Sequence, residues 1–252
     1  MTTRWRLSAL EFVVAWEHLG FDRLPTPLSF LGTAETAAEF ETHKAAAART
    51  LLSKGDDNLH RALTVLAEPL AEAVVCGVDN RASENLVRIR AGVDRTVGAV
   101  VTQLPGHTRE AGSDVLLSLQ RRTEVGEALA QSLPTAPAGK GKGLTVHRSD
   151  LGNRGDGSLM RSAGYVSPRA EAIRFFDRPH TMFGEVLVRA SPRREGRTEA
   201  AGEVLQWIDF ADDGRYVIRN ADTIAAVSAS PYVVAREVQR MLTRVEADLA
   251  SL

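Results

Sequence analysis

Four short segments near the middle of the chain alternate apolar and polar side chains with a period of two. This period predicts four β-strands, at 73–79, 84–92, 95–103 and 113–120. The connections between them are turn sequences, at Asp79-Asn80, Gly92-Val93-Asp94 and Pro105-Gly106. Because such turns are too short for a crossover helix, neighbouring strands must pair antiparallel. The centre of the chain is therefore predicted to be an antiparallel meander and not a series of βαβ units.

The first segment of the chain has the signals of a helix start. Ser8 and Glu11 match a capping box, and Gly20 is placed to end a helix. Apolar residues between them follow helical spacing, although alternation of Leu10 with Phe12 leaves a strand as the alternative. The cap and the terminal glycine favour the helix.

Further helices are predicted before and after the meander, at 33–54, 57–70 and 123–133. The first two are joined by only a few residues and are expected to pack antiparallel to each other. A short strand is predicted at 28–31, after Pro25 and Pro27.

The second half of the chain repeats the plan of the first. Ser167-Pro168 is a good helix start, with proline in the first turn. Elements follow in the order helix, three strands, helix, at 167–177, 181–191, 201–210, 214–219 and 231–249. Similar strand openings at Gly98, Gly184 and Gly202 suggest that the two halves are related by a quasi-two-fold axis.

A segment rich in proline, glycine and lysine separates the halves. We predict an N-terminal half at 1–133, a flexible linker at 134–143 and a C-terminal half at 144–252, together forming one domain. A second stretch of low order is expected at 150–158. The element order predicts the α+β class, with a central antiparallel β-sheet.

Composition excludes several classes of protein. The formal net charge of −1 gives no basic surface of the kind that binds nucleic acid. The N-terminus has no apolar signal core, and no apolar run reaches the roughly 18 residues that a membrane span needs. A cytoplasmic location is expected. Cys76 is the single cysteine, and its apolar neighbours predict that it is buried in a strand.

No catalytic or metal-binding pattern is present, so we predict no catalytic residue, cofactor or metal site. The six histidines lack the spacing of a helical zinc site, and there is no Gly-x-Ser-x-Gly elbow. The lysines within Gly139–Gly143 do not open a helix after a strand, as a phosphate-binding loop requires. The acidic residues Asp209, Asp212 and Asp213 lack the EF-hand pattern and predict a turn.

The order of motifs along the chain resembles the EspG family. The matching segments are Trp5-Arg6-Leu7-Ser8-Ala9-Leu10-Glu11-Phe12, Trp16-Glu17-His18-Leu19-Gly20, Gly184-Glu185-Val186, Gly196-Arg197, Trp207-Ile208-Asp209 and Asp213-Gly214-Arg215-Tyr216. The Gly-Arg-Tyr strand before the last helix is the most specific of these pieces.

The resemblance implies a fold and a function. It implies a central antiparallel sheet flanked by helical bundles at both ends, with quasi-two-fold related halves. It further implies a cytosolic, non-enzymatic chaperone of type VII (ESX) secretion in actinobacteria. Its partner would be a helical secreted substrate, PPE-like in a PE–PPE-like heterodimer or WXG100-like, whose apolar tip is kept covered before export. The chain is shorter than the mycobacterial pattern, so another substrate remains open.

Candidate partner-binding residues lie on the predicted strands and one turn: Asp79, Asn80, Arg81, Arg88, Arg90 and Trp207. Leu86, Arg88 and Arg90 alternate on one side of their strand, which predicts a side that faces solvent or a partner. For the arginines the alternative is simple solvation, and for Trp207 it is the core. Two other functions stay open, namely an enzyme on an α+β scaffold with an unrecognised site and a homodimeric interaction module.

Overall fold

In the computed structural model, which describes residues 2–82, 85–152, 166–191 and 202–250, ten strands form one antiparallel sheet. The strands are β1 (Thr3–Leu7), β2 (Ala71–Asp79), β3 (Leu86–Val93), β4 (Val97–Pro105), β5 (Gly112–Arg121), β6 (Leu144–His147), β7 (His180–Ala190), β8 (Glu203–Phe210), β9 (Arg215–Asn220) and β10 (Thr223–Ser228). The helices are α1 (Ala9–His18), α2 (Ala37–Lys54), α3 (Asp57–Ala67), α4 (Val125–Ser132), α5 (Arg148–Gly152), α6 (Pro168–Phe176) and α7 (Pro231–Ala250), with one 3₁₀ turn, η1 (Arg122–Glu124). The α+β class and the central antiparallel sheet are confirmed.

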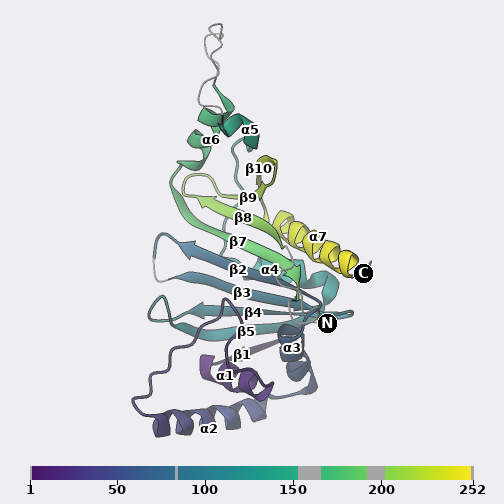
Figure 1. Ribbon diagram of the computed structural model, residues 1–252. Coiled ribbons are helices and arrows are strands. Elements are labelled where there is room, and N and C mark those ends of the chain that lie inside the picture. Colours follow the sequence, from purple (N-terminus) through teal and green to yellow (C-terminus); the bar gives the residue numbers. More distant parts are fainter. Residues whose placement is uncertain (1, 83–84, 153–165, 192–201, 251–252) are drawn as a thin grey trace.

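The strand order shows how the two halves are related. Across the sheet it runs β1-β5-β4-β3-β2-β7-β8-β9-β10-β6. Exchanging β2 with β7, and each strand outward from there with its counterpart, reproduces the same order. The helices follow this relation as well, because α3 and α6 precede the two meanders while α4 and α7 follow them. Figure 1 shows β2 and β7 side by side at the middle, with α1–α3 at one end and α5 and α6 at the other.

The quasi-two-fold relation is thus present, although its predicted source is wrong. Gly98 lies on β4, Gly184 lies on β7 and Gly202 precedes β8. The relation pairs these strands with β9, β2 and β3, and not with one another. The similar strand openings therefore reflect shared strand-forming residues and not equivalent positions.

Most predicted elements are present, but three strands were missed. These are β1, β6 and β10, which form or adjoin the two edges of the sheet. β1 and β6 contain only 5 and 4 residues, too few for a period of two to be recognised. The second stretch of predicted low order begins within α5, and residues 153–158 lie outside the described part of the chain.

The strand predicted at 28–31 is wrong. Residues 28–34 form no regular element, and the backbone there is satisfied by a side chain instead of a strand. The Gln103 amide accepts a hydrogen bond from the Ser29 N–H at 2.9 Å and donates one to the Ser29 carbonyl at 2.7 Å. Gln103 is itself buried, so it substitutes locally for a neighbouring strand.

The helices near the N-terminus form the cover of one end of the sheet. α1 begins with the predicted capping box at Ser8 and Glu11. α2 starts only at Ala37, because Thr36 provides the N-cap. α2 packs mainly on α1, whereas α3 packs on β3, β4 and β5, so the expected pairing of these two helices is not their main contact.

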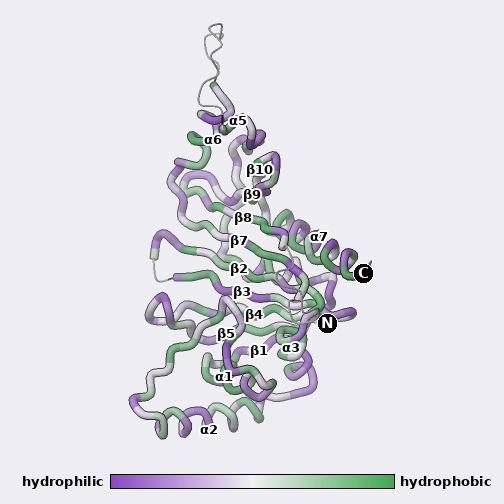
Figure 2. The backbone as a smooth tube through the Cα atoms, viewed as in Figure 1, coloured by the Kyte–Doolittle hydropathy of each residue, from purple (hydrophilic) through white to green (hydrophobic). Residues whose placement is uncertain are grey.

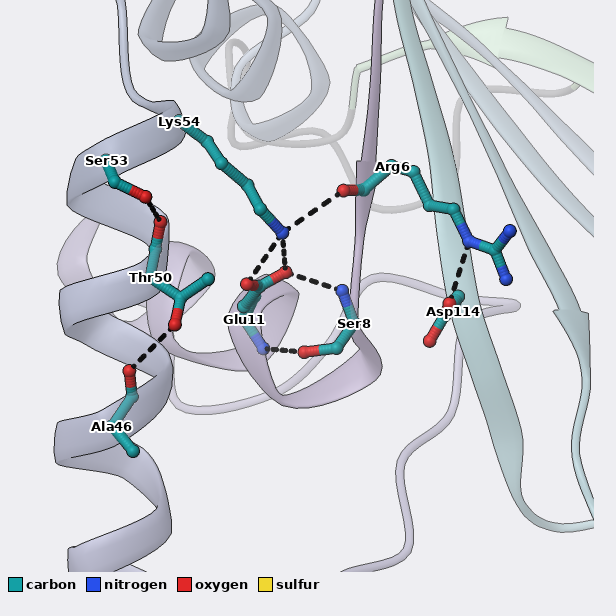
Figure 3. Close-up of polar contacts among 8 residues, drawn as sticks. All are labelled: Arg6, Ser8, Glu11, Ala46, Thr50, Ser53, Lys54 and Asp114. Atoms are coloured by element: carbon teal, nitrogen blue, oxygen red, sulfur yellow. Dashed lines mark hydrogen bonds and ion pairs between the residues drawn. The ribbon is translucent and has the colours of Figure 1, made fainter.

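An ion pair joins the end of α2 to the start of α1 (Figure 3). The Lys54 ammonium lies 2.8 Å from both carboxylate oxygens of Glu11, while Glu11 also caps Ser8. Glu11 is buried, so its charge is compensated by one lysine and one backbone N–H. The contact fixes how α2 lies against the first turn of α1.

Three apolar clusters hold the sheet between its helices. On one side, α4 and α7 cover β2, β3, β7 and β8. On the other side, α1 and α3 pack on β4 and β5, and α6 packs on β6, β8, β9 and β10. Figure 2 shows apolar residues along the central strands between these helical ends.

Trp207 closes the α7 side of the sheet at the two-fold axis. Gly77 and Gly184 are register partners on β2 and β7, and the Trp207 ring lies across both. A Cβ atom at Gly77 would lie 2.7 Å from that ring, and one at Gly184 would clash with it as well. The two glycines therefore allow a buried tryptophan to pack directly on the sheet backbone.

The segment predicted as a flexible linker is held in place. Its backbone joins Arg215, with the Gly139 N–H donating to the Arg215 carbonyl at 3.0 Å and the Arg215 N–H donating to the Pro137 carbonyl at 2.7 Å. The Asp213 carboxylate accepts hydrogen bonds from the N–H groups of Lys140 and Gly141. The glycines that suggested flexibility are needed for close packing, since a Cβ atom at Gly139 would overlap the Tyr216 ring.

Candidate partner-binding face

The helical covers leave the middle of the sheet open on one side. Following the register from Val101 on β4 to Arg90, Val74, Leu187 and Val204 shows that α1–α3 and α6 lie on the same side of the sheet. Between them, no helix among the described residues packs on that side of β2, β7 and the adjoining parts of β3 and β8. We call this region the central face; its side chains are Cys76, Val78, Leu86, Phe183, Glu185, Leu187, Val204 and Gln206.

The central face is largely apolar and accessible. Phe183 is 45% exposed and Val204 is 42% exposed, high values for apolar residues at the middle of a sheet. A shallow depression of about 370 Å³ lies among them. It is lined by Pro27, Cys76, Gly77, Val78, Leu86, Val87, Arg88, Arg109, Phe183, Gly184, Glu185 and Gln206. Exposed apolar surface with a polar rim is typical of a protein-binding site.

The predicted turn residues lie at one end of this face. Asp79 ends β2, and its carboxylate accepts hydrogen bonds from the Arg81 guanidinium at 2.9 Å through both oxygens. These hydrogen bonds hold the pKa of the Asp79 carboxyl below its usual range. Asn80 donates from its backbone N–H to the Thr181 carbonyl at 2.8 Å. The turn is thereby fixed beside the start of β7 and offers Arg81 to solvent.

The two strand arginines, predicted as partner-binding candidates, do not follow the alternative of simple solvation. Arg88 is only 4% exposed, and its guanidinium donates to the backbone carbonyl of Arg109. Arg90 is largely buried, pairs with Glu72 at 2.5 Å and donates to the Thr26 carbonyl at 3.1 Å. Segments distant in sequence fold over both side chains, which the alternation within one strand could not reveal.

Trp207 lies on the opposite side of the sheet from the central face. It is 2% exposed and belongs to the cluster under α7. The core alternative is therefore the correct one, and a partner bound to the central face does not touch this ring. Asp79, Asn80 and Arg81 are brought together in the turn after β2, where the Asp79 side chain has the same register side as Gly77 and Trp207. Arg88 lines the depression, and Trp207 is separate from it.

The sequence missed the residues that make this face apolar. Cys76 was expected to be buried, whereas it is exposed, because the strand side on which it lies has no helix over it. Phe183, Glu185 and Val204 alternate with buried residues on β7 and β8. The only available signal was the continuous apolar run of β2, which indicates that both sides of a strand are apolar but not that both are covered.

No group of three or more histidine, cysteine, aspartate or glutamate residues among the described residues could hold a metal ion. No helix in the described ranges is both long and apolar enough to cross a membrane.

A protein-family model matches this chain. The model of the EspG family matches residues 8–245, nearly the whole sequence. The chain belongs to the EspG family. No curated protein matches the sequence of this EspG-family chain significantly.

Solved structures give the same fold. Eleven solved chains match, among them the type VII secretion system chaperone EspG5 of Mycobacterium tuberculosis, solved in complex with a PE25–PPE41 dimer. The TM-score is 0.55 over 95% of this chain and 96% of that chain, at 11% sequence identity. At this identity the match concerns the fold of the EspG-family chain.

Proposed function

We propose that this EspG-family chain is a cytosolic chaperone of type VII secretion, which binds the helical tip of a PE–PPE-like heterodimer and keeps it soluble until export. The observation that carries the proposal is the central face, an apolar strip left open at the middle of the sheet between two helical covers. A chaperone of the same fold was solved bound to a PE–PPE dimer, which supports a partner of this kind.

The chemistry of the central face favours binding over catalysis. Phe183, Leu86 and Val204 supply apolar area that loses water when a helix tip covers it. Although Cys76 is exposed, neighbouring atoms partly remove its thiol from water, and this desolvation together with the Glu185 charge raises the pKa of the thiol. The thiol is therefore not activated as a nucleophile. We therefore propose a non-enzymatic role.

Co-expression with candidate partners tests the proposal. The tagged chain is co-expressed with PE–PPE-like pairs from its own genome, and complexes are measured by size-exclusion chromatography with light scattering. We expect one copy of each chain per complex. Phe183→Asp is expected to weaken binding at least about ten-fold, because a charge in a desolvated apolar contact is unfavourable.

A matched control separates binding from folding. Leu116 is 43% exposed on β5, close to the value for Phe183, but its side chain points to the α4 side of the sheet. Leu116→Asp should leave the affinity unchanged. Equal losses in both variants, a homodimer formed through the central face, or no complex with any pair would contradict the proposal.

A further inference from the structure

We infer that the depression in the central face contains a carboxylate-binding subsite, in which Arg88 pairs with an acidic side chain that the bound partner presents beside an apolar residue. The partner named here is the one of the proposed function, so this part of the inference rests on that proposal. The selectivity for a carboxylate is carried by the geometry around Arg88.

The Arg88 guanidinium is buried without full compensation. Its Nη2 donates to the Arg109 carbonyl, but its Nη1 is shielded from water and has no hydrogen-bond partner. Burial lowers the pKa of this guanidinium, as expected for a cation removed from water. A buried charge of this kind is unfavourable unless an acceptor is supplied, so the site favours an anion.

Other buried arginines of the chain do have carboxylate partners. Arg215 is 3% exposed and lies 2.7 Å from the Asp209 carboxylate. Arg90, the next residue on the same side of β3, pairs with Glu72. Arg88 forms no ion pair with any carboxylate in the described residues. The Glu110 charge acts on the Arg88 guanidinium from the same turn as Arg109, but Glu110 makes no ion pair with it. The contrast with Arg215 and Arg90 leaves Arg88 as the buried cation that can take a carboxylate from outside the chain.

The surroundings of Arg88 define what such a partner must present. On β2 its register partner is the uncharged Cys76, and on the next strand Cys76 faces Glu185. Glu185 is exposed and forms no ion pair in the described part of the chain, so it repels an acid at the β7 side of the depression. Phe183 and Leu86 supply the apolar walls. An acidic group is therefore favoured on the β3 side, next to an apolar contact.

Access to Nη1 requires one local movement. Arg109 lies in the turn between β4 and β5 and lines the same depression. A carboxylate reaches Nη1 if the Arg109 backbone moves aside or if the Arg88 side chain turns outward. In either case the carboxylate replaces the Arg109 carbonyl with an ionised acceptor, which makes a stronger hydrogen bond.

A small acid tests the subsite without the protein partner. The full chain, labelled with ¹⁵N, is titrated with 3-phenylpropanoate, which joins a carboxylate to an aromatic ring, and with the neutral 3-phenylpropanamide. We expect the backbone N–H signals of Arg88, Cys76 and Phe183 to shift and saturate as 3-phenylpropanoate is added. The neutral 3-phenylpropanamide should bind at least about ten-fold more weakly. Equal binding of the two probes would show an apolar depression without charge selection and would overturn the inference.

Two variants assign the effect to these charges. Arg88→Gln, checked for folding by thermal unfolding, should remove the preference for the acid. Glu185→Gln changes an exposed residue and should strengthen binding of the acid probe about two-fold. If the acid binds equally well to wild type and Glu185→Gln, the charge selection is wrong, whether or not Arg88→Gln folds.

The outcomes separate the subsite from the proposed function. If a PE–PPE-like pair co-purifies but the chain does not distinguish the two probes, the subsite is wrong and the chaperone proposal stands. If the probes are distinguished but no pair co-purifies, the carboxylate site stands and the proposed partner is wrong.

Discussion

The two sides of the central strands differ although they share the same backbone. On β2, Val75 is fully buried under α7, while the next residue, Cys76, faces solvent. On β8, Trp207 is sealed between α7 and two glycines, while its neighbour Gln206 lines the open depression. Both sides are largely apolar. The comparison teaches that an apolar side of a strand needs a cover. For the central face, the proposed function supplies this cover from another molecule.

The free-energy cost of exposing apolar side chains on the open side is limited, because helices cover the strands on either side of it. α1–α3 and α6 cover the outer strands on that side, so only the middle of the sheet is accessible. Within the open region, the polar side chains of Glu185 and Gln206 interrupt the apolar surface. A narrow apolar strip interrupted by polar groups stays soluble more easily than a whole uncovered sheet.

The largest expected effect is a loss of stability when the packing on the sealed side is disrupted. Trp207→Ala removes a ring that is 2% exposed and should lower the free energy of unfolding by about 3–5 kcal/mol. Phe183→Ala, on the open side, should cost less than about 1 kcal/mol in stability because the ring is 45% exposed. Urea unfolding measures both. Similar losses in the two variants would mean that the two sides do not differ as described.

The second prediction concerns the buried charge where the open side meets the α1–α3 cover. Glu72 is 1% exposed and is paired with Arg90 at 2.5 Å and with Arg189 at 2.8 Å. Glu72→Ala leaves both arginines without this acceptor and should destabilise the chain by about 3 kcal/mol. Glu72→Gln keeps the size and part of the hydrogen bonding, and it should cost less in the same urea experiment. An Ala variant as stable as wild type would contradict this account.

Low pH should destabilise the fold around Asp213, at the border where α6 begins to cover the sheet beside the central face. Burial acts to raise the pKa of the Asp213 carboxyl, but hydrogen bonds from Arg178, the Lys140 N–H and Tyr216 hold it well below its usual range. A folded pKa below the unfolded value of about 4 stabilises the fold above that pH, and this contribution is lost as the pH falls toward the folded value.

Asp213→Asn tests this border. The substitution should cost about 1–2 kcal/mol at neutral pH, since hydrogen bonds to a charged group are lost from a partly exposed site. The variant should also lose less stability than wild type when thermal unfolding is followed from about pH 6 to about pH 2. Parallel pH profiles for the two proteins would show that Asp213 does not carry this dependence.

The smallest expected effect on stability comes from comparing two neighbouring residues of β2, one on each side of the sheet. Cys76→Ala, on the open side, should change stability by no more than about 0.5 kcal/mol. Val75→Ala, on the sealed side, removes two buried methyl groups and should cost about 2 kcal/mol, from lost burial and a residual cavity. The matched pair is measured by urea unfolding. A Cys76 effect as large as that of Val75 would place a cover over the open side.

Much of the fold could be predicted because its signals are local. The capping box of α1, the proline start of α6 and the alternation of β3 to β5 depend on residues a few positions apart. The candidate site depends on neighbours far along the chain. Gln103 reaches Ser29, Arg109 covers Arg88, and the open region exists only because β2 pairs with β7.

Two features of the structure could not be read from the sequence for this physical reason. Glycines at 139–143 have the same composition in a flexible linker and in a segment packed under Tyr216. Arginines at 88 and 90 alternate like solvated residues, yet each is covered by a distant segment.

The sequence by itself determined most of the elements, their order and the membership of a family, because hydrogen-bonded caps, turns and apolar periods act over a few residues. Only the tertiary structure decided which side of β2 and β7 is left without a helix, and which arginine is buried without a carboxylate. The open side depends on the pairing of β2 with β7, more than 100 residues apart, and the burial of Arg88 depends on Arg109, 21 residues away. The period of one strand carries no information about what covers it.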